Sequence, residues 1–564
     1  MAARQPILDP SLIQGVGQSW AGEIEHGEVF TRQWVVDLIL HLVGYDASKD
    51  LSGTVLVEPA CGAGAFLGPV VSRLSASCAR HGRSLTDASD AIRAFDLVPR
   101  NVEQSRSLVQ AILVKGGWTS SAAGKAARTW VREADYLLID HEDDDVDFVV
   151  GNPPYIRLED VPVDRMEAYR SVCATMTGRS DVYIGFYEMG LRSLRQGGVL
   201  GFICADRWMR NQYGKHLRQL ISEAYSVEAA IIMHDVDAFD EQVSAYPAIT
   251  VVRRDPQDSA IIADTTKDFG EPDVPAVMSW ARDESAGAIS CSHFNAARLP
   301  GWFSGQDSWP TGSPTRLALI EHLNERFAPL EEKRTGTRVG IGVATGADGI
   351  FLATTADVEH DRMLPLSMVR DIASGHLKWS GTHLVNPWDE SGQLVNLDDY
   401  PRLRRYFERN GAALRRRHVA GKRASAWYRT IDKVDAKLTA RQKLLIPDMK
   451  TSLFPVFDDG GYYPHHNLYY VVSDSWDLKV LGGLLMSRVA QAFVEAYAVR
   501  MRGGTLRFQA QYLRKIRVPH PDSLTPDDKS QLISSFLARD VDLATKVAVR
   551  LYRAEDFVDA LSGH

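Results

Sequence analysis

The chain has 564 residues, of which 45% are hydrophobic and 24% charged, so it is an ordinary globular chain of two to four domains at about 150 residues each. Its apolar runs are far shorter than the ~20 residues of a membrane span, and its N-terminus lacks the apolar core of a secretory signal. The net charge of -8 argues against a uniformly basic surface. The five cysteines include no Cys-x-x-Cys pair, which argues against a disulfide framework and a thiolate zinc site. Such cysteine usage predicts a cytoplasmic protein.

Short apolar runs alternate with amphipathic stretches through the first half, which predicts βα units around a mostly parallel sheet. The expected strands, in chain order, cover 54–60, 91–98, an element ending in 133–139, 146–150, 198–205, 227–233 and 248–253. Helices are expected up to about 79, from about 101, over 181–194 and near 214–225. Seven strands with intervening helices predict an α/β fold: a doubly wound, seven-stranded, Rossmann-like domain.

A glycine turn follows the first expected strand, where Cys61-Gly62-Ala63-Gly64 precedes a helix. Glycines at such a turn let the backbone bend sharply and approach a ligand closely. The spacing of Gly62, Gly64 and Gly68 differs from that of a dinucleotide site, so a tight structural turn is an equally open interpretation. Asp96 ends the next strand, where a carboxylate can accept hydrogen bonds from ribose hydroxyls.

The tetrapeptide Asn152-Pro153-Pro154-Tyr155 follows the strand over 146–150. Its two prolines stiffen the turn. The Asn152 side chain and the Pro153 carbonyl are acceptors, and Tyr155 offers an aromatic face. Two acceptors beside a stacking platform suit an exocyclic amino group on a planar ring. An Asn-Pro turn alone would need neither the aromatic residue nor the preceding apolar strand.

Composition changes after Arg254. We predict a catalytic domain over 1–254, a linker with accessory structure over 255–332, and a second unit over 333–564 that ends in a helical tail. Residues 401–450 hold 15 Lys or Arg against 4 Asp or Glu, a local balance of +11. Such a segment indicates either a polyanion surface or a solvated basic helix.

No metal site is expected. His465 and His466 are adjacent, so in an extended segment they would point to opposite faces and could not share one ion. Asp143, Asp144 and Asp145 are interpreted as a solvated acidic turn.

The two motifs VLVEPACGAG and DFVVGNPPY, about ninety residues apart, resemble those of the gamma-class N6-adenine DNA methyltransferases of TaqI or Eco57I type, found in bacterial restriction–modification systems. TRVGIGVATGADGIFLA and MRGGTLRFQAQYLRKIRVP resemble the opening and the close of a TaqI-like target-recognition domain. The resemblance implies S-adenosylmethionine as methyl donor without a metal, and a flipped-out adenine in double-stranded DNA as substrate. It also implies a mixed α+β recognition domain, a nucleoid-associated location and a restriction endonuclease encoded separately.

The resemblance also implies roles for individual residues. HGEVFTRQWVVDLIL is similar to the family's N-terminal cofactor motif, with Thr31-Arg32 where the family has Thr-Pro. The cofactor-binding residues it implies are Phe30, Thr31, Glu58, Pro59, Ala60, Gly62, Gly64, Asp96 for the ribose, Asp135 and Tyr136 for the adenine, and Asn152, with Asp181 and Tyr183 near the methionine end.

For catalysis, Asn152 and the Pro153 carbonyl would accept the two N6 hydrogens, with Pro154 stiffening the turn and Tyr155 stacking on the base. Phe239 is expected as the second stacking aromatic, with Tyr246 as the alternative. The DNA-backbone contacts are expected from Arg415, Arg416, Arg417, Lys422 and Arg423.

Other functions stay open at this point. The same tetrapeptide serves methyltransferases that act on RNA or on a protein glutamine amide, but a C-terminal unit of this size favours DNA. A non-catalytic DNA-binding subunit is disfavoured by the intact motifs. A fused restriction nuclease is also disfavoured, because the sequence has no recognisable nuclease carboxylate–lysine cluster.

Overall fold

The computed structural model describes residues 30–141, 145–233, 235–240, 247–500 and 506–561. The chain divides into two compact units between Pro314 and Thr315. The domain boundaries predicted at 254 and 332 stay predictions. The described helices are all too short or too polar to cross a membrane.

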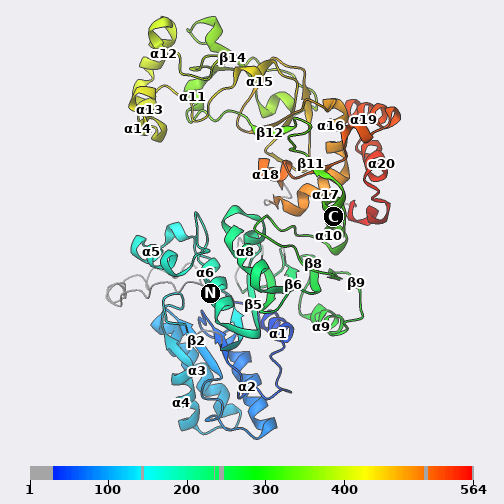
Figure 1. The fold of residues 1–564 in the computed structure, drawn as a ribbon. Coiled ribbons are helices and arrows are strands. Elements are labelled where there is room, and N and C mark those ends of the chain that lie inside the picture. Colours follow the sequence, from blue (N-terminus) through cyan, green and yellow to red (C-terminus); the bar gives the residue numbers. More distant parts are fainter. Residues whose placement is uncertain (1–29, 142–144, 234, 241–246, 501–505, 562–564) are drawn as a thin grey trace. The chain divides into compact units, whose positions relative to one another are not determined.

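Within the described part of the first unit, ten strands form one sheet in the order β3-β2-β1-β4-β5-β7-β6-β8-β10-β9 (Figure 1). Their bounds are β1 Leu56–Glu58, β2 Ile92–Asp96, β3 Val131–Glu133, β4 Val146–Gly151, β5 Leu194–Ala205, β6 Ser226–Ile232, β7 Pro247–Arg253, β8 Ala260–Thr265, β9 Ala288–Ser290 and β10 Phe294–Leu299. The strands from β3 to β5 are parallel, and β7 runs antiparallel to both β5 and β6.

The predicted doubly wound α/β fold is confirmed. The chain passes from β1 outward to β2 and β3, and then returns to place β4 on the other side of β1. The order therefore reverses between β1 and β4, and a ligand crevice is expected outside the carboxyl ends of these strands.

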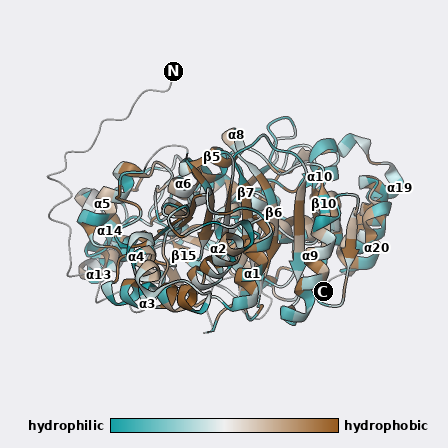
Figure 2. Cartoon of the chain, turned by 90° about the horizontal axis from the view of Figure 1, so that it is seen from below, coloured by the Kyte–Doolittle hydropathy of each residue, from teal (hydrophilic) through white to brown (hydrophobic). Residues whose placement is uncertain are grey.

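Helices cover both faces of this sheet. Their bounds are α1 Gln33–Leu42, α2 Leu67–His81, α3 Pro99–Lys115, α4 Ser120–Trp130, α5 Val163–Val172, α6 Tyr183–Ser193, α7 Arg207–Arg210, α8 Lys215–Ala224 and α9 Val274–Arg282. A Cβ atom at Gly201 of β5 would lie 2.5 Å from Val43, just after α1, whereas one at Gly190 of α6 would lie 3.0 Å from Leu200. Because successive strand residues face opposite ways, α1 and α6 pack closely on opposite faces of β5. Figure 2 shows β6 and β7 coloured as hydrophobic strands.

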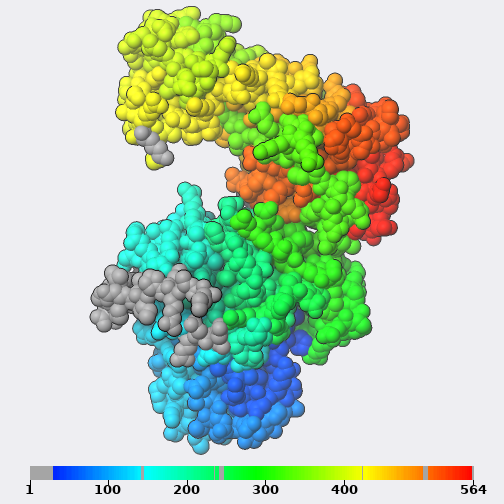
Figure 3. Space-filling view, viewed as in Figure 1, coloured from blue at the N-terminus to red at the C-terminus, as the bar shows by residue number. Residues whose placement is uncertain are grey.

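Two details differ from the sequence-based expectations. The sheet has three strands more than the predicted seven, because β8, β9 and β10, from the segment expected to hold a linker and accessory structure, extend it beyond β6. The part of this segment up to Pro314, green in Figure 3, lies against the rest of the first unit. The third strand ends at Glu133, because a turn at Asp135, whose carbonyl accepts from Leu138 N–H at 2.9 Å, breaks the extended run.

The second unit is mixed α+β, as predicted, with two four-stranded sheets in the orders β12-β20-β16-β18 and β13-β15-β14-β19. Its strands are β11 Ala328–Pro329, β12 Arg338–Ile341, β13 Leu352–Ala353, β14 Met363–Ser367, β15 His383–Val385, β16 Lys443–Pro447, β17 Met449–Lys450, β18 Val456–Asp458, β19 Tyr463–Pro464, β20 Leu468–Val472, β21 Val499–Arg500, β22 Leu506–Arg507 and β23 Arg517–Val518. Its helices are α10 Pro314–Arg326, α11 Asp348–Phe351, α12 Pro401–Arg409, α13 Gly411–Arg415, α14 His418–Lys422, α15 Ala436–Ala440, α16 Leu478–Met486, α17 Arg488–Tyr497, α18 Ala510–Leu513, α19 Pro526–Ala538 and α20 Val541–Tyr552.

A fully buried ion pair lies in the core of the second unit. Lys443 Nζ of β16 is 2.9 Å from the Asp458 carboxylate of β18, and neither side chain has any exposure. Burial lowers the pKa of Lys443 and raises that of Asp458, although each charge opposes the shift in its partner. Removing one charge would leave the other buried without compensation.

Asp458→Ala should therefore destabilise the second unit by ~3–5 kcal/mol, whereas the double change Lys443→Met with Asp458→Leu should cost far less. Amide hydrogen exchange of β16 and β18 in the full chain measures the change in local unfolding free energy. Asp542→Ala, which breaks the exposed pair with Arg488, is the matched control and should shift exchange by less than ~1 kcal/mol. A double variant as unstable as Asp458→Ala would contradict the electrostatic explanation.

Candidate active site

One cavity opens at the carboxyl ends of β1, β2 and β4, at the reversal of strand order. Most of the residues predicted for the site line this cavity: Phe30, Thr31, Glu58, Pro59, Ala60, Gly62, Asp96, Asp135, Tyr136, Asn152, Pro153, Pro154 and Tyr155. Gly64, Asp181 and Tyr183, which were also expected at the cofactor, lie outside the lining. Segments spread over more than a hundred residues of sequence thus supply one concave surface.

The two glycines in the turn after β1 are required for different reasons. Gly62 and Gly64 have φ of +50° and +98°, in the left-handed region that favours glycine. A Cβ at Gly62 would meet no atom within 4 Å, so this backbone faces open space in the cavity. A Cβ at Gly64 would lie 2.5 Å from Leu108 of α3. Gly62 therefore gives a ligand close access to the backbone, and Gly64 lets the turn pack on α3.

Asp96 holds this turn in place. Its Oδ2 accepts from the N–H of Gly62 at 2.9 Å, and its Oδ1 accepts from the N–H of Val98 at 2.8 Å. Ser105 Oγ donates to the Gly62 carbonyl at 2.8 Å. A carboxylate oxygen can accept more than one hydrogen bond, so Asp96 can position the turn and still meet a ligand hydroxyl.

Glu58 is the buried acid of the cavity. It is the last residue of β1, its side chain is 1% exposed, and its Oε2 has no hydrogen-bond partner among the described residues. Burial raises its pKa well above the usual value, and the nearby Asp96 carboxylate raises it further. An unpaired acceptor in this position suits a ligand that carries hydrogen-bond donors.

Asp135 and Tyr136 line the cavity but already have protein partners. The Asp135 carboxylate accepts from Tyr169 Oη at 2.9 Å and lies 3.7 Å from Arg165 Nε, both on α5. Tyr136 stacks on Phe186 of α6 at 5.7 Å between ring centroids. The roles predicted for these two residues in holding an adenine ring stay predictions, and the structure gives them a second role in joining α5 and α6 to the cavity wall.

Asn152 to Tyr155 follow the end of β4 and line the same cavity. Tyr155 packs against Phe239 with 6.3 Å between ring centroids and an angle of 81°, and against Tyr183 at 6.4 Å. The two rings are therefore nearly perpendicular and do not form parallel walls. Tyr246, the alternative second aromatic, lies outside the described residues.

The start of the described chain is bound to the segment that holds Phe239. Thr31 forms an antiparallel bridge with Phe239. Arg32 donates its backbone N–H to Ala238 O at 3.0 Å and its Nε to Phe239 O at 3.2 Å, and it pairs with Asp237 at 2.7 Å. A proline at position 32 could not make the first of these bonds.

Several cavity residues had no signal in the motifs. Tyr169 comes from α5 and closes on Asp135. Val182 and Phe186 line the cavity, whereas Asp181 and Tyr183, expected near the methionine end, do not. Tyr183 is instead fully buried, with its Oη 2.9 Å from that of Tyr213. The spacing of Val182 and Phe186, one turn apart on a helix, could have identified this face.

The predicted DNA-contact arginines lie on or beside α13 and α14, which sit with α12 at one end of the second unit (Figure 1). Arg415, Arg416 and Arg423 are exposed, and Arg415 lies over the Trp427 ring at 3.8 Å. Arg417 is half-buried and donates to the carbonyls of Leu414, Thr345, Trp427 and Arg429. Its guanidinium thus holds the local backbone. Nothing is described of the Lys422 side chain.

The expectation that His465 and His466 point to opposite faces is wrong. Their ring centroids are only 4.1 Å apart, because the two residues follow the short strand β19 and precede β20, where the backbone turns. Among the described residues, the two histidines and Asp348 form a group of three possible metal ligands. Asp143 and Asp144 lie outside the described residues, and Asp145 pairs with Arg93 at 2.6 Å.

Comparison with protein families gives two matches. Residues 84–239 match the Eco57I restriction-modification methylase family, and residues 371–518 match the TaqI-like C-terminal specificity domain. The first match includes β4 and Asn152 to Tyr155, and the second includes the basic segment.

Relatives match over nearly the whole chain. The type II methyltransferase M.PaeR7I of Pseudomonas aeruginosa is 43% identical, over 93% of this chain and 91% of its own. The type II methyltransferase M.XhoI of Xanthomonas vasicola is 40% identical, over 94% and 97%. Among solved structures, the type IIL restriction-modification enzyme MmeI has a similar fold, with a TM-score of 0.53 at 13% identity over 99% of this chain and 76% of that one.

The buried Glu58 carboxyl should make the ligand-free protein less stable as pH rises. The raised pKa means that the folded state retains a proton that the unfolded state releases above its ordinary pKa, so stability declines from about pH 5 upward. Glu58→Gln removes this dependence and should raise the thermal midpoint by roughly 2–4 °C at pH 8, and by less at pH 5.

Thermal unfolding of wild type and of Glu58→Gln from pH 5 to pH 8 measures the difference between their thermal midpoints. Glu133→Gln, at the exposed end of β3 in the same sheet, is the control. A gap between wild type and Glu58→Gln that stays constant with pH would contradict the assignment.

Proposed function

The chain belongs to the type II methyltransferases of restriction–modification systems, and from this premise we propose that it is a site-specific DNA adenine-N6 methyltransferase with S-adenosylmethionine as methyl donor. The observation that carries the proposal is the single cavity in which Glu58, Asp96 and Asn152 come together. Double-stranded DNA is its proposed substrate, and a separately encoded restriction endonuclease its proposed partner in the cell.

The cavity suits a nucleoside carrying a charged thioether chain. The unpaired Glu58 oxygen and the Asp96 carboxylate offer acceptors, Gly62 leaves room at the backbone, and Leu97 and Phe186 give apolar surface for a purine. S-adenosylmethionine would supply an electrophilic methyl group. We propose that Glu58 and Asp96 hold its polar groups, at the strand ends where such sheets bind nucleotides.

The chemistry proposed for this chain's residues is positioning and polarisation. Asn152 Oδ1 and the Pro153 carbonyl would accept the two hydrogens of an exocyclic amino group and orient its lone pair toward the methyl group. Pro153 and Pro154 restrict the backbone that carries both acceptors. Because methyl transfer is a direct displacement, holding the nitrogen in line with the methyl carbon accounts for much of the rate.

The target adenine would have to leave the helix, since its N6 atom is not reachable for chemistry in the stack. Tyr155 would stack on the flipped base, worth ~1–3 kcal/mol by analogy with other base–aromatic contacts. In the present arrangement Phe239 lies nearly perpendicular to Tyr155, with 6.3 Å between the ring centroids. We propose that Phe239 turns or shifts as the base enters and then contacts its other side.

The recognition of DNA is assigned to the second unit, from its match to the TaqI-like specificity domain. The exposed Arg415, Arg416 and Arg423 are proposed to neutralise phosphates. Arg417 is proposed to orient them by binding four backbone carbonyls of the same region. Methyltransferases that act on RNA or on a protein amide would not need a DNA specificity domain.

Asn152→Ala should lower methyl transfer by at least ~10²-fold while S-adenosylmethionine still binds, because the change removes an acceptor for the amino group rather than the cofactor cradle. Modified-base sequencing of DNA from cells that express each protein measures the substrate, base and target sequence together. Binding of the cofactor is followed separately by calorimetry, with Gln104→Ala on the exposed face of α3 as the control.

Three outcomes would overturn parts of this proposal. Full methylation by Asn152→Ala would remove the role of Asn152. N4-methylcytosine in place of N6-methyladenine would overturn the base assignment. Methylated RNA or protein with unmodified DNA would overturn the substrate.

Replacing both Arg416 and Arg423 with Ala should weaken DNA binding and reduce the slope of log K against log salt by about two, since each lost phosphate contact removes about 0.9. Arg417→Ala is expected to reduce the stability of the region more than the slope, because its donors are bound to backbone carbonyls. Binding titrations over a range of salt concentrations, with thermal unfolding of each variant, separate these effects. An unchanged slope in the double variant would place the phosphate contacts elsewhere.

A further inference from the structure

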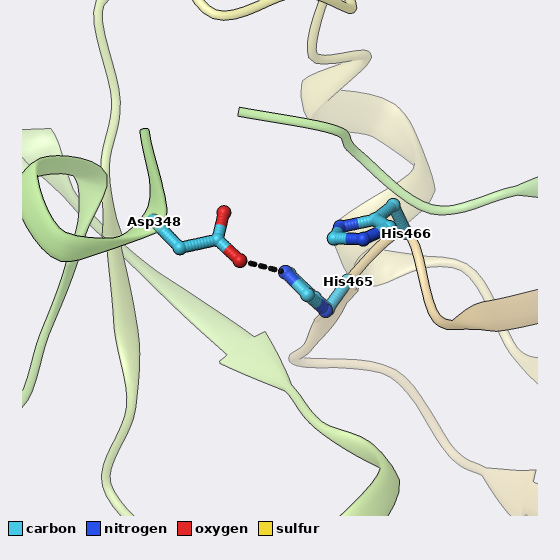
Figure 4. Close-up of side chains that lie close together, drawn as sticks. All are labelled: Asp348, His465 and His466. Atoms are coloured by element: carbon cyan, nitrogen blue, oxygen red, sulfur yellow. Dashed lines mark hydrogen bonds and ion pairs between the residues drawn. The ribbon is translucent and has the colours of Figure 1, made fainter. Parts of the chain in front are cut away.

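Three possible metal ligands meet in the second unit, far from the cavity in sequence. Asp348 begins α11, and His465 and His466 follow β19. Ligand atoms of the three side chains all lie within 4.8 Å of one another. Figure 4 shows the Asp348 carboxylate pointing at the His465 ring, with the His466 ring beside it.

The backbone around the two histidines is held firmly. The His465 N–H donates to Ser367 O at 3.0 Å, and the His466 N–H donates to Val343 O at 3.1 Å. Gly342 approaches so closely that a Cβ there would lie 2.2 Å from the His465 carbonyl. The surrounding strands therefore fix the backbone from which both imidazole rings extend.

A simple Asp–His pair does not account for this cluster. His465 Nε2 is 3.2 Å from Asp348 Oδ2, which satisfies one nitrogen of a side chain that is only 2% exposed. The Nδ1 atoms of both His465 and His466 are buried and have no hydrogen-bond partner among the described residues. Buried polar atoms in folded proteins usually have a partner, and an ion would supply one for His466 Nδ1, whereas His465 faces Asp348 through Nε2 and would bind the same ion through that atom.

We propose that Asp348, His465 and His466 bind one divalent transition-metal ion of the zinc class. Two imidazoles and one carboxylate match the nitrogen and oxygen ligands of zinc, whereas magnesium and calcium prefer oxygen ligands alone. Ligands of a tetrahedral zinc ion lie about 3.4 Å apart. The Asp348–His465 distance of 3.2 Å already fits, and a side-chain rotation of His466 would bring the third ligand atom, now within 4.8 Å of the other two, to this spacing.

The surroundings of Asp348 support a ligand role. Thr345 Oγ1 donates to Asp348 Oδ1, so this oxygen is held and Oδ2 faces His465. Hydrogen bonds of this kind fix the orientation of carboxylate ligands. The Thr345 carbonyl in turn accepts from Arg417 at 3.0 Å. A bound ion would thus brace the segment between β12 and α11, to which the basic segment is attached.

Zinc binding to the untagged full chain, after removal of metal with a chelator, tests the proposal. A competing chromophoric chelator measures stoichiometry and affinity, and Co²⁺ in place of Zn²⁺ reports nitrogen coordination by its absorption spectrum. The wild type should bind one ion per chain. His466→Phe, which keeps a ring at the position, and Asp348→Asn should each weaken binding at least ten-fold. His376→Gln, an exposed histidine of the same unit, should not.

A second readout does not depend on the affinity measurement. Zinc should raise the thermal midpoint of the stripped wild type and of His376→Gln, but not that of His466→Phe. Both ligand variants alter partly exposed side chains, and circular dichroism checks that they fold. A wild type without stoichiometric binding, or equal binding by all four proteins, would overturn the site.

Discussion

One carboxylate, that of Asp96, joins the ends of two neighbouring parallel strands, and the candidate active site depends on this contact. Parallel register places Glu58 beside Ala94, so Asp96 reaches two residues beyond the end of β1 and accepts from Gly62 in the turn that follows. The same side chain accepts from Val98 after β2. The turn can then keep a left-handed glycine at the cavity, because the N–H and the carbonyl of Gly62 both have partners.

A second set of contacts joins the beginning of the described chain to the far half of the sheet. Arg32 binds the backbone of Ala238 and Phe239 and the side chain of Asp237. The family that the motif resembles has a proline at this position, and the proline ring would fix the turn. Here the Arg32 side chain binds residues 237–239 instead, and the segments that hold Phe30 and Phe239 are thereby connected.

The sequence predicted the parts of the site that follow strand ends, because a buried strand and its turn are both visible in local pattern. Glu58, Asp96 and Asn152 were identifiable in this way, and so was the α/β fold. Tyr169 was not, because a helix residue that closes on Asp135 from 34 positions away leaves no periodic signal. The prediction for His465 and His466 is wrong, since a two-residue strand does not continue in the extended alternation that would separate their side chains. Charge alone did not distinguish Arg417 from Arg416, because only the fold shows which guanidinium is bound to carbonyls.

The buried carboxyl of Glu58 also links ligand capture to proton exchange with the solvent. A hydrogen-bond donor that reaches its unpaired oxygen favours the ionised form, so a group that held a proton in the free protein would release it on binding. The heat of binding would then include the ionisation heat of whichever buffer takes up that proton. Two buffers of equal pH would report different enthalpies for one and the same affinity, and their difference would count the protons that leave the cavity.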